Sequence, residues 1–237
     1  MTGNLKHPWL SIIVPVLDEQ AGIAASLDAL NASRQAARLD TELIVVDGIS
    51  QDQTLSLARD RADVVIVSGR GRGRQLNAGA AQARGELLLF LHADTVLPPD
   101  AITLLAQAMA KNPDARWGRF DVRISGRSRM FPVIAALMNL RSAWTGIATG
   151  DQAMFVRRAS FDAAGGFPDQ RLMEDIELSC RLLRLPQGRP LRLRSKVTTS
   201  GRRWETRGVW ATIWLMWRLR WRYWRGASPD ELGKAYR

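Results

Sequence analysis

Residues 10–19 read LSIIVPVLDE, a short and almost unbroken apolar run that ends in two acids. Runs of this kind are typical of strands that are buried on both faces of a parallel sheet. Three more follow at ELIVVD (42–47), DVVIVS (63–68) and ELLLFLH (86–92). Segments with helical length and periodicity lie between and after them, at 20–38, 52–61, 75–84 and 99–110. This alternation predicts βαβ units, and therefore an α/β fold with a doubly wound, mostly parallel, Rossmann-like sheet.

The pattern changes after Lys111, where the regular alternation ends. We expect strands at 116–124, 150–158 and 192–197, and helices at 129–140 and 174–185. The change predicts one catalytic domain over residues 1–200, with a nucleotide-binding half at about 1–110 and an acceptor half at about 111–200. Residues 201–237 are expected to form a basic, tryptophan-rich helical tail.

The composition excludes several classes of protein. With 46% hydrophobic residues among 237, the chain can bury a large core, which excludes a wholly disordered protein. Cys180 is the only cysteine, so a disulfide scaffold and an all-cysteine metal site are excluded. We find neither an apolar leader nor an apolar run of about 18 residues, so no cleaved signal peptide or spanning helix is expected. These features predict a cytoplasmic protein.

Positive charge is concentrated at the end of the chain. Residues 1–180 carry 19 Lys/Arg and 20 Asp/Glu, a net charge of −1, whereas residues 181–237 carry 15 and 3, a net charge of +12. Such asymmetry indicates a polyanionic partner for the C-terminal end. A membrane surface, a nucleic acid and a phosphorylated substrate all fit this description.

Acidic residues follow three of the four apolar runs. Asp18 and Glu19 follow the first, Asp47 ends the second, and Asp94 follows the fourth. Because ligands bind at the carboxyl ends of the strands in an open parallel sheet, these acids should share one crevice. Such a crevice suits Mg²⁺ or Mn²⁺ bridging a diphosphate, and Asp47 would accept hydrogen bonds from a base or a ribose.

Two further segments are candidates for the site. Arg70, Arg72 and Arg74 lie in the Gly-rich stretch SGRGRGRQLN, which is either a phosphate-binding loop or an exposed loop. Glu174 and Asp175 open the expected helix at 174–185. An acid there either complements the helix dipole or acts as a general base against the crevice.

Six short motifs in this order resemble those of a family 2 glycosyltransferase with the GT-A fold, over roughly residues 9–200. They are PVLDE (15–19), DGISQDQT (47–54), NAGAAQARG (77–85), HAD (92–94), GDQ (150–152) and MED (173–175). With the later TSGRRWETRG (199–208), the arrangement looks closest to a short bacterial subgroup of these enzymes. That subgroup is named for gene neighbourhoods of radical-SAM and selenodomain enzymes and of arsenosugar biosynthesis.

The resemblance implies an inverting hexosyltransferase-like enzyme that moves a sugar from a nucleotide-sugar donor to an acceptor hydroxyl. Asp175 would be the general base, Asp94 would bind a divalent cation, and Arg74 would contact the diphosphate. The other positions that match the family would position the base (Asp151, Gln152, Glu174) or hold the donor (Pro15, Val16, Glu19, Asp47, Asn77, His92, Ala93). His92 stands where the family often has the first aspartate of its metal motif, and an imidazole there shifts the preference toward Mn²⁺.

The tail carries a stripe of tryptophans. Their spacing of 4, 3, 4 and 3 residues places five of them on one face of a helix over 209–224 (Trp210, Trp214, Trp217, Trp221, Trp224), with arginines among them. The helix would lie on an anionic membrane surface, pack on the core or on a second copy, or bind nucleic acid, and we favour the membrane surface. The tail thus favours peripheral attachment to the inner face of the membrane and a lipid-linked acceptor, with no nucleic-acid partner.

Two other functions are compatible with parts of this pattern. A sugar nucleotidyltransferase also needs a nucleotide crevice and a divalent cation, although the Gly-rich signature expected after the first strand is missing. A non-catalytic basic module would bind a membrane or nucleic acid through the tail, and it leaves the acids at the strand ends unexplained.

Overall fold

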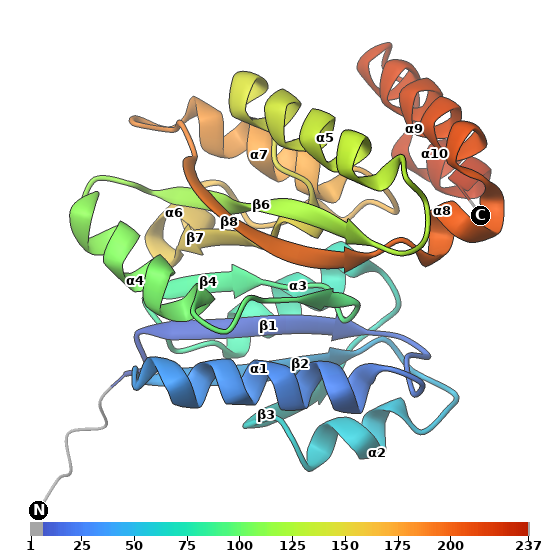
Figure 1. Cartoon of the computed structure of the whole chain (residues 1–237). Coiled ribbons are helices and arrows are strands. Elements are labelled where there is room, and N and C mark those ends of the chain that lie inside the picture. Colours follow the sequence, from blue (N-terminus) through green and yellow to red (C-terminus); the bar gives the residue numbers. More distant parts are fainter. Residues whose placement is uncertain (1–6, 237) are drawn as a thin grey trace, which may run out of the picture.

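Four parallel strands form the first half of one eight-stranded sheet (Figure 1). This computed structural model describes residues 7–236, apart from the side chains of Asp230, Lys234 and Tyr236. They are β1 (Leu10–Val16), β2 (Thr41–Asp47), β3 (Val64–Val67) and β4 (Leu87–Phe90). Parallel neighbours need crossover connections, and α1 (Ile23–Ala37), α2 (Thr54–Arg59) and α3 (Arg72–Gln82) supply them. The predicted βαβ half is therefore confirmed.

The second half of the sheet is mixed. β7 (Met154–Arg157) pairs antiparallel with both β4 and β6 (Trp117–Ser125), and β8 (Leu191–Ser200) runs parallel to β6. The two-residue strand β5 (Thr95–Val96) closes the edge, so the order is β3-β2-β1-β4-β7-β6-β8-β5. β5 is too short to be recognised from periodicity.

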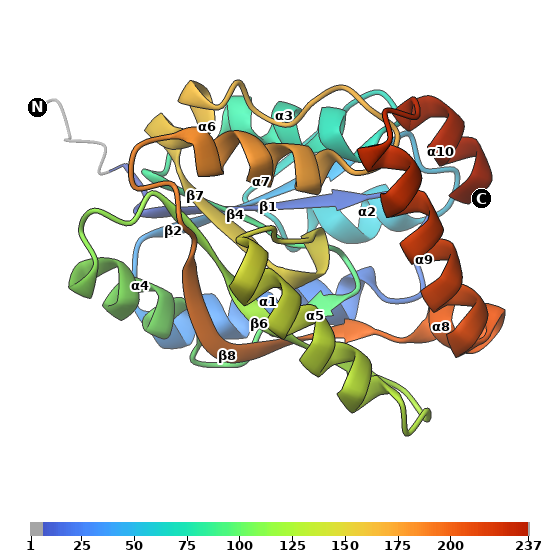
Figure 2. The same ribbon diagram turned by 90° about the horizontal axis from the view of Figure 1, so that it is seen from above.

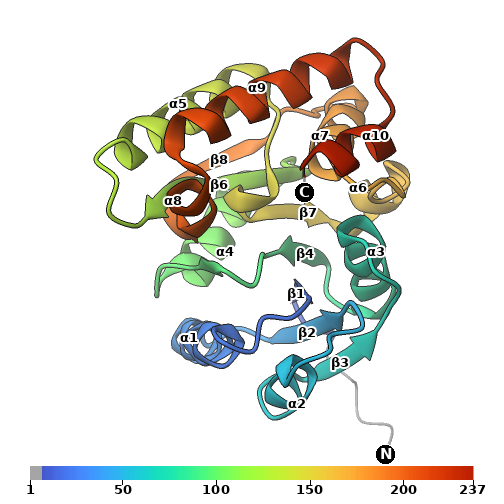
Figure 3. The same cartoon turned by 90° about the vertical axis from the view of Figure 1, so that its right-hand side faces the viewer.

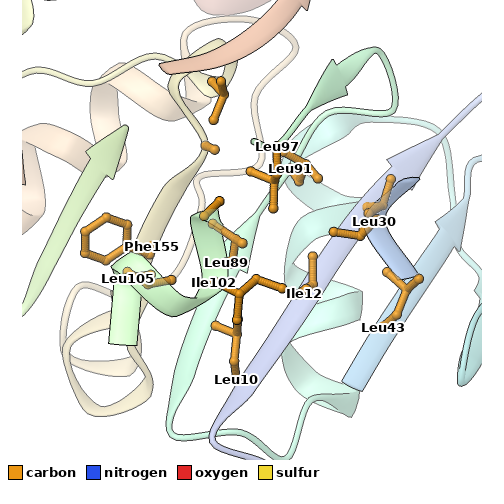
Figure 4. Close-up of a cluster of buried hydrophobic side chains, with 14 of the residues drawn as sticks. Leu10, Ile12, Leu30, Leu43, Leu89, Leu91, Leu97, Ile102, Leu105 and Phe155 are labelled. Carbon is orange, nitrogen blue, oxygen red and sulfur yellow. The ribbon is translucent and has the colours of Figure 1, made fainter. Parts of the chain in front are cut away.

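Alternation along the strands builds two cores, one on each face of the sheet. Leu10, Ile12 and Val14 belong to one apolar cluster, and Ile13 belongs to the other. The first cluster includes side chains of α1 and α4 (Ala101–Lys111), and Figure 4 shows part of it, with Leu10, Ile12 and Ile102 close together. The second includes side chains of α3, α6 (Arg158–Ala163) and α7 (Glu174–Arg184). Strands with two buried faces explain the unbroken apolar runs in the sequence.

The helices accordingly form two layers (Figure 2). One face of the sheet carries α3, α6 and α7, and the other carries α1 and α4. α5 (Phe131–Thr145) packs against β6 and lies next to α7 in Figure 1. After β8, the chain forms α8 (Arg202–Arg207), α9 (Val209–Trp224) and α10 (Pro229–Tyr236). These three helices lie at the side toward which β1, β2 and β4 point, as Figure 3 shows.

One expected strand begins later than predicted. Residues 150–158 were expected to be extended, but Gly150–Gln152 form a single 3-10 turn (η1) and Arg158 already begins α6. Thr149 and Gln152 hold that turn with a reciprocal capping box, in which the Thr149 side chain accepts from the Gln152 backbone and the Gln152 side chain accepts from the Thr149 backbone. This local hydrogen bonding replaces the first ladder bonds of the strand.

The tryptophan stripe of α9 does not pack on the core, so that alternative was wrong. The five rings are between 61% and 79% exposed, whereas Thr212 and Leu219 on the opposite face are buried. Ile213 packs against an apolar cluster with Ile134 of α5, and Leu219 belongs to a cluster with Ile176 of α7. Within the described residues, the structure contains no helix of sufficient length and hydropathy to span a bilayer.

Candidate active site

The carboxyl ends of β1 and β2 present a buried acid with one free oxygen. Asp47 is 1% exposed, and its Oδ2 accepts a hydrogen bond from the backbone N–H of Ser50 at 2.9 Å. Its Oδ1 is buried and has no hydrogen-bond partner among the described residues. Since buried acceptors are nearly always paired in complete sites, Oδ1 is suited to an N–H or O–H of a ligand.

Gln75 braces this end of the sheet, and the motifs did not reveal it. Its Nε2 donates to the carbonyls of Val16 at 2.9 Å and of Val46 at 2.8 Å. The Val16 side chain lies in the core, so Val16 meets a ligand only through its backbone, whereas Pro15 is half-buried. Gln75 lies four residues before Gly79, which packs on β1 and β2. Because residues four apart share one face of a helix, this spacing is the sequence signal that places Gln75 against the sheet.

Two acids lie at the carboxyl ends of the neighbouring strands β1 and β4. Asp94 is exposed, and no hydrogen bond or ion pair holds its carboxylate within the described part of the chain. Burial raises the pKa of Glu19, Arg202 opposes this shift, and the charge of Asp94 raises the pKa further. The Arg202 Nη2 atom lies 3.9 Å from Glu19 Oε2. Glu19 and Asp94 are therefore close enough to interact electrostatically, as their positions after β1 and β4 predict.

No set of three or more His, Cys, Asp or Glu side chains is arranged to hold a metal ion among the described residues. The exposed carboxylate of Asp94 nevertheless fits a hard cation, because Mg²⁺ and similar ions often take one or two carboxylates and complete their shell with water and substrate phosphates. Ala93, next to it, is half-buried and packs against the first apolar cluster.

Gly150 connects three of the predicted site residues. His92 Nδ1 lies 3.3 Å from Asp151 Oδ1. A Cβ on Gly150 would lie only 2.2 Å from His92 Nε2, so the imidazole packs directly on this glycine. The Gly150 N–H donates to Asp175 Oδ2 at 2.8 Å. The η1 turn thus brings the imidazole and the Asp175 carboxylate to the same glycine.

Asp175 is held rigidly at the start of α7. Its Oδ1 accepts from the N–H of Ile176 at 2.8 Å, so each carboxylate oxygen has one backbone donor and keeps a lone pair for a substrate hydroxyl. Met173 precedes the helix in the left-handed region, with φ of 66°. Strained residues of this kind persist where the surrounding structure fixes them, and they cluster at functional sites.

Electrostatics separate the acids around Asp175. Burial and the charge of Asp175 raise the pKa of Glu174, whose Oε1 lies 3.7 Å from Arg72 Nη1. Burial also acts to raise the pKa of Asp151, but the hydrogen bond and charge of His92 and the charge of Arg72 bring it below its usual value. Asp151 is thus an ionised partner of His92, and Glu174 is biased toward the neutral form.

A small cavity joins these groups. It is lined by polar groups of Arg72, His92, Glu174 and Asp175 and by apolar side chains of the second core. A larger concavity, of about 280 Å³, is lined by Trp9, Glu86 and Leu87 among others, and therefore lies at the opposite, amino ends of β1 and β4. We place the site at the carboxyl ends, where open α/β sheets bind ligands.

Three predicted residues lie nearby but face other protein groups. Asn77 donates to the Phe167 carbonyl at 2.8 Å and accepts from the Phe167 N–H at 2.9 Å. Gln152 is fully buried and caps η1. The Arg74 guanidinium makes a two-point ion pair with Asp169, at 2.6 and 2.8 Å. Asn77 and Arg74 thus hold the loop that precedes α7, and Arg72 is the arginine of the Gly-rich loop that faces the acids.

Arginines of α8 were not predicted to belong to the site. Arg202 faces Glu19, and burial together with the charge of Arg72 lowers the pKa of Arg203, while Asp151 and Asp94 oppose that shift. The sequence signal was the pair of arginines directly after the last strand, in TSGRRWETRG. The start of the tail therefore covers the acidic edge.

The family model described as glycosyl transferase family 2 matches residues 11–166 of this chain. The chain belongs to this family. The matched range includes the free Oδ1 of Asp47, Asp94 and the η1 turn, and it ends before Asp175. The resemblance to family 2 is thus confirmed at the level of the family.

Similar proteins support the same assignment. The family 2 chain is 27% identical over 250 residues to a probable glycosyltransferase, YdaM, of Bacillus subtilis (strain 168), covering 94% of this chain and 56% of that protein. It is 28% identical over 157 residues to an undecaprenyl-phosphate 4-deoxy-4-formamido-L-arabinose transferase of Pseudomonas paraeruginosa, covering 62% of this chain and 46% of that protein. The chain therefore spans about half the length of these relatives.

A solved structure supports the fold. A mannosyltransferase from Pyrobaculum calidifontis, in complex with GDP-Man and Mn²⁺, superposes with a TM-score of 0.66 at 21% identity, covering 98% of this chain and 70% of that one. This family 2 chain therefore has the predicted GT-A fold.

Proposed function

We propose that this chain is an inverting glycosyltransferase that moves a sugar from a nucleotide-sugar donor to an acceptor hydroxyl. The observation that carries the proposal is the pairing of a fixed carboxylate, Asp175, with a buried free acceptor at Asp47 and an exposed acid at Asp94. A nucleoside would bind Asp47 and the backbone of Pro15 and Val16, next to Glu19. This assigns residues from about 1–110 to the donor and residues from about 111–200 to the acceptor.

Asp175 would take the proton of the acceptor hydroxyl as its oxygen attacks the sugar carbon opposite the leaving diphosphate. Its two backbone donors hold the carboxylate in a fixed orientation. Glu174 and Arg72 lie beside it, and Arg72 would stabilise negative charge on the leaving group. A divalent cation at Asp94, Mn²⁺ or Mg²⁺, would also offset that charge when bound. Arg74 would reach the diphosphate only by leaving Asp169.

Thermal stability with nucleotide sugars tests the donor site. We expect one of UDP-, GDP- or dTDP-sugars to stabilise the protein, by about 2.7 kcal/mol at a hundredfold excess over the dissociation constant. The shift should require Mn²⁺ and be lost in Asp94→Asn, and Asp47→Asn should weaken donor binding at saturating Mn²⁺. Asp28→Asn, an exposed acid on α1, is the control. A folded protein that no nucleotide sugar stabilises would refute the donor site and favour the non-catalytic module.

The reaction products distinguish this function from the sugar nucleotidyltransferase alternative. That enzyme would bind a nucleoside triphosphate with a sugar phosphate and release pyrophosphate. Release of a nucleoside diphosphate from a nucleotide sugar supports the glycosyltransferase.

We also propose that, within family 2, this chain belongs to the short bacterial subgroup that has the same arrangement of motifs.

We propose further that the tail holds the enzyme at the inner face of the membrane. The five tryptophans of α9 are exposed, and α5, which packs against α9, carries a second exposed apolar stripe formed by Val133, Leu137, Leu140 and Trp144. Arg218 and Arg225 lie over the rings of Trp214 and Trp221, at 5.1 and 4.9 Å from the ring centres. Tryptophan rings with arginines beside them suit the headgroup region of an anionic bilayer.

Vesicle co-sedimentation tests this contact. We expect binding to vesicles that contain phosphatidylglycerol, weaker binding to phosphatidylcholine alone, and loss of binding when Trp214 and Trp217 are both replaced by Ala. Val67→Ala changes an exposed apolar residue of β3 and is the control. Equal binding by the tryptophan variant would exclude α9 as the contact.

A further inference from the structure

We propose that Arg141 of α5 and Arg220 of α9 form a binding site for a phosphate group of the acceptor, beside Asp175. The proposal rests on the glycosyltransferase function proposed above and deepens it, because it names the chemical class of the acceptor. None of the sequence motifs includes either arginine.

Arg141 carries buried donors that no group of the described structure satisfies. Its Nε and Nη2 atoms are inaccessible to solvent and have no hydrogen-bond partner. A guanidinium offers five N–H donors, and leaving such donors buried and unpaired is costly. The arginine therefore does not stabilise the fold through these atoms, and an incoming anion would satisfy them.

Arg220 brings a second positive charge to the same place. It is half-buried, and the described residues provide neither an ion pair nor a hydrogen bond for its guanidinium. Burial, and then the charge of Arg220, lower the pKa of Arg141 to about 10, while Asp175 opposes the shift. Burial also lowers the pKa of Arg220, opposed by Asp175 and Asp151. The two cations repel each other, and both lie within the field of the proposed base.

The packing of α5 on α9 explains how the two arginines meet. Ile134 and Ile213 belong to one apolar cluster between these helices, and Arg141 and Arg220 each follow seven residues later. Seven residues are close to two helical turns, so each arginine continues the same face of its helix. Figure 3 shows α5 and α9 next to each other above the edge of the sheet.

A phosphate monoester matches this pair in charge and geometry. It carries about −1.5 to −2 charges at pH 7 and three strong acceptor oxygens, and guanidinium groups bind it through paired hydrogen bonds. The nearby Asp175 leaves the Nε and Nη2 donors of Arg141 without a hydrogen bond. The phosphate would orient the acceptor so that its hydroxyl reaches Asp175. It would belong either to a lipid headgroup or to a soluble phosphorylated acceptor.

Binding of two phosphate monoesters to the full chain tests the site. The probes are glycerol 3-phosphate and dihexanoyl phosphatidate, a short-chain lipid with the same headgroup chemistry, measured by calorimetry with nucleoside diphosphate present. We expect Arg141→Gln and Arg220→Gln each to weaken both probes at least tenfold. Arg129→Gln, an exposed arginine in the loop before α5, should change neither by more than twofold. Tighter binding of the lipid identifies a lipid acceptor, and equal affinities identify a soluble one.

A second measurement separates a binding role from a structural one. Without ligand, Arg141→Gln should unfold at the same temperature as the wild type or above it, because it removes unpaired buried donors. Unchanged phosphate affinity in both arginine variants would overturn the site, and so would a weaker affinity of Arg141→Gln that is accompanied by a lower unfolding temperature without ligand. Nucleotide binding is recorded in the same samples. If nucleotides bind and phosphate does not, only the acceptor site fails, and if no nucleotide binds to the wild type, the proposed function itself fails.

Discussion

Replacing Asp175 with Asn tests the proposed chemistry most directly. General base catalysis typically contributes about 10²–10⁴-fold to a rate. At ~1.36 kcal/mol for each factor of ten, the variant should lose roughly 3–5 kcal/mol of transition-state stabilisation. Donor affinity should change little, because Asp175 is proposed to contact the acceptor hydroxyl and is not among the residues proposed to hold the nucleotide.

The same substitution should also cost some stability. Both oxygens of Asp175 accept from backbone N–H groups, those of Gly150 and Ile176, each at 2.8 Å. The amide of Asn would direct its NH₂ group at one of these donors, leaving a hydrogen bond unmade at a cost of about 1–3 kcal/mol. A modest fall in unfolding temperature is therefore expected together with the loss of rate.

The assay is release of nucleoside diphosphate from the nucleotide sugar, followed with water alone and with added acceptors. Calorimetry gives the donor affinity of each variant, and Asp162→Asn, an exposed acid on α6, is the control. A folded Asp175→Asn protein that keeps more than about a tenth of the wild-type rate would refute the base assignment, since the smallest typical contribution is about a hundredfold. Equal loss of rate and donor affinity would show that Asp175 serves binding instead.

Two other substitutions have defined outcomes. Gly150→Ala should lower the rate at least tenfold, because the new Cβ would lie 2.2 Å from His92 Nε2 and the imidazole would have to move. An unchanged rate would contradict this, and Gly69→Ala, where a Cβ meets no atom, is the control. Burial alone would raise the pKa of Glu42, but hydrogen bonds from Ser11 and Arg84 bring this pKa below its usual value. The ionised carboxylate therefore stabilises the fold above the unfolded-state pKa near 4.5, and this stabilisation is lost as the pH falls through the folded-state pKa. Glu42→Gln should thus lower the free energy of unfolding by about 2 kcal/mol at pH 7 and by much less at pH 3 in denaturant titrations, and a constant difference would contradict this cause.

The sequence alone determined the parallel half of the sheet and the edge that carries the chemistry. Its apolar runs are unbroken because both faces of these strands are covered, and its acids follow the strands because the carboxyl ends meet at one edge. The motifs also placed Asp47, Asp94 and Asp175 in family order. Prediction of the elements failed only locally, as at Gly150–Gln152, where a capped 3-10 turn replaces the start of the expected strand.

Only the tertiary structure decided which side chains meet. Asn77 bonds to Phe167, 90 residues later, and Arg141 approaches Arg220 from another helix, contacts that no local period encodes. The outward direction of the tryptophan stripe was also undecided, because α9 is apolar on both faces. Packing decided it: α9 packs Ile213 against α5, buries Leu219 against α7 and leaves the larger rings in solvent.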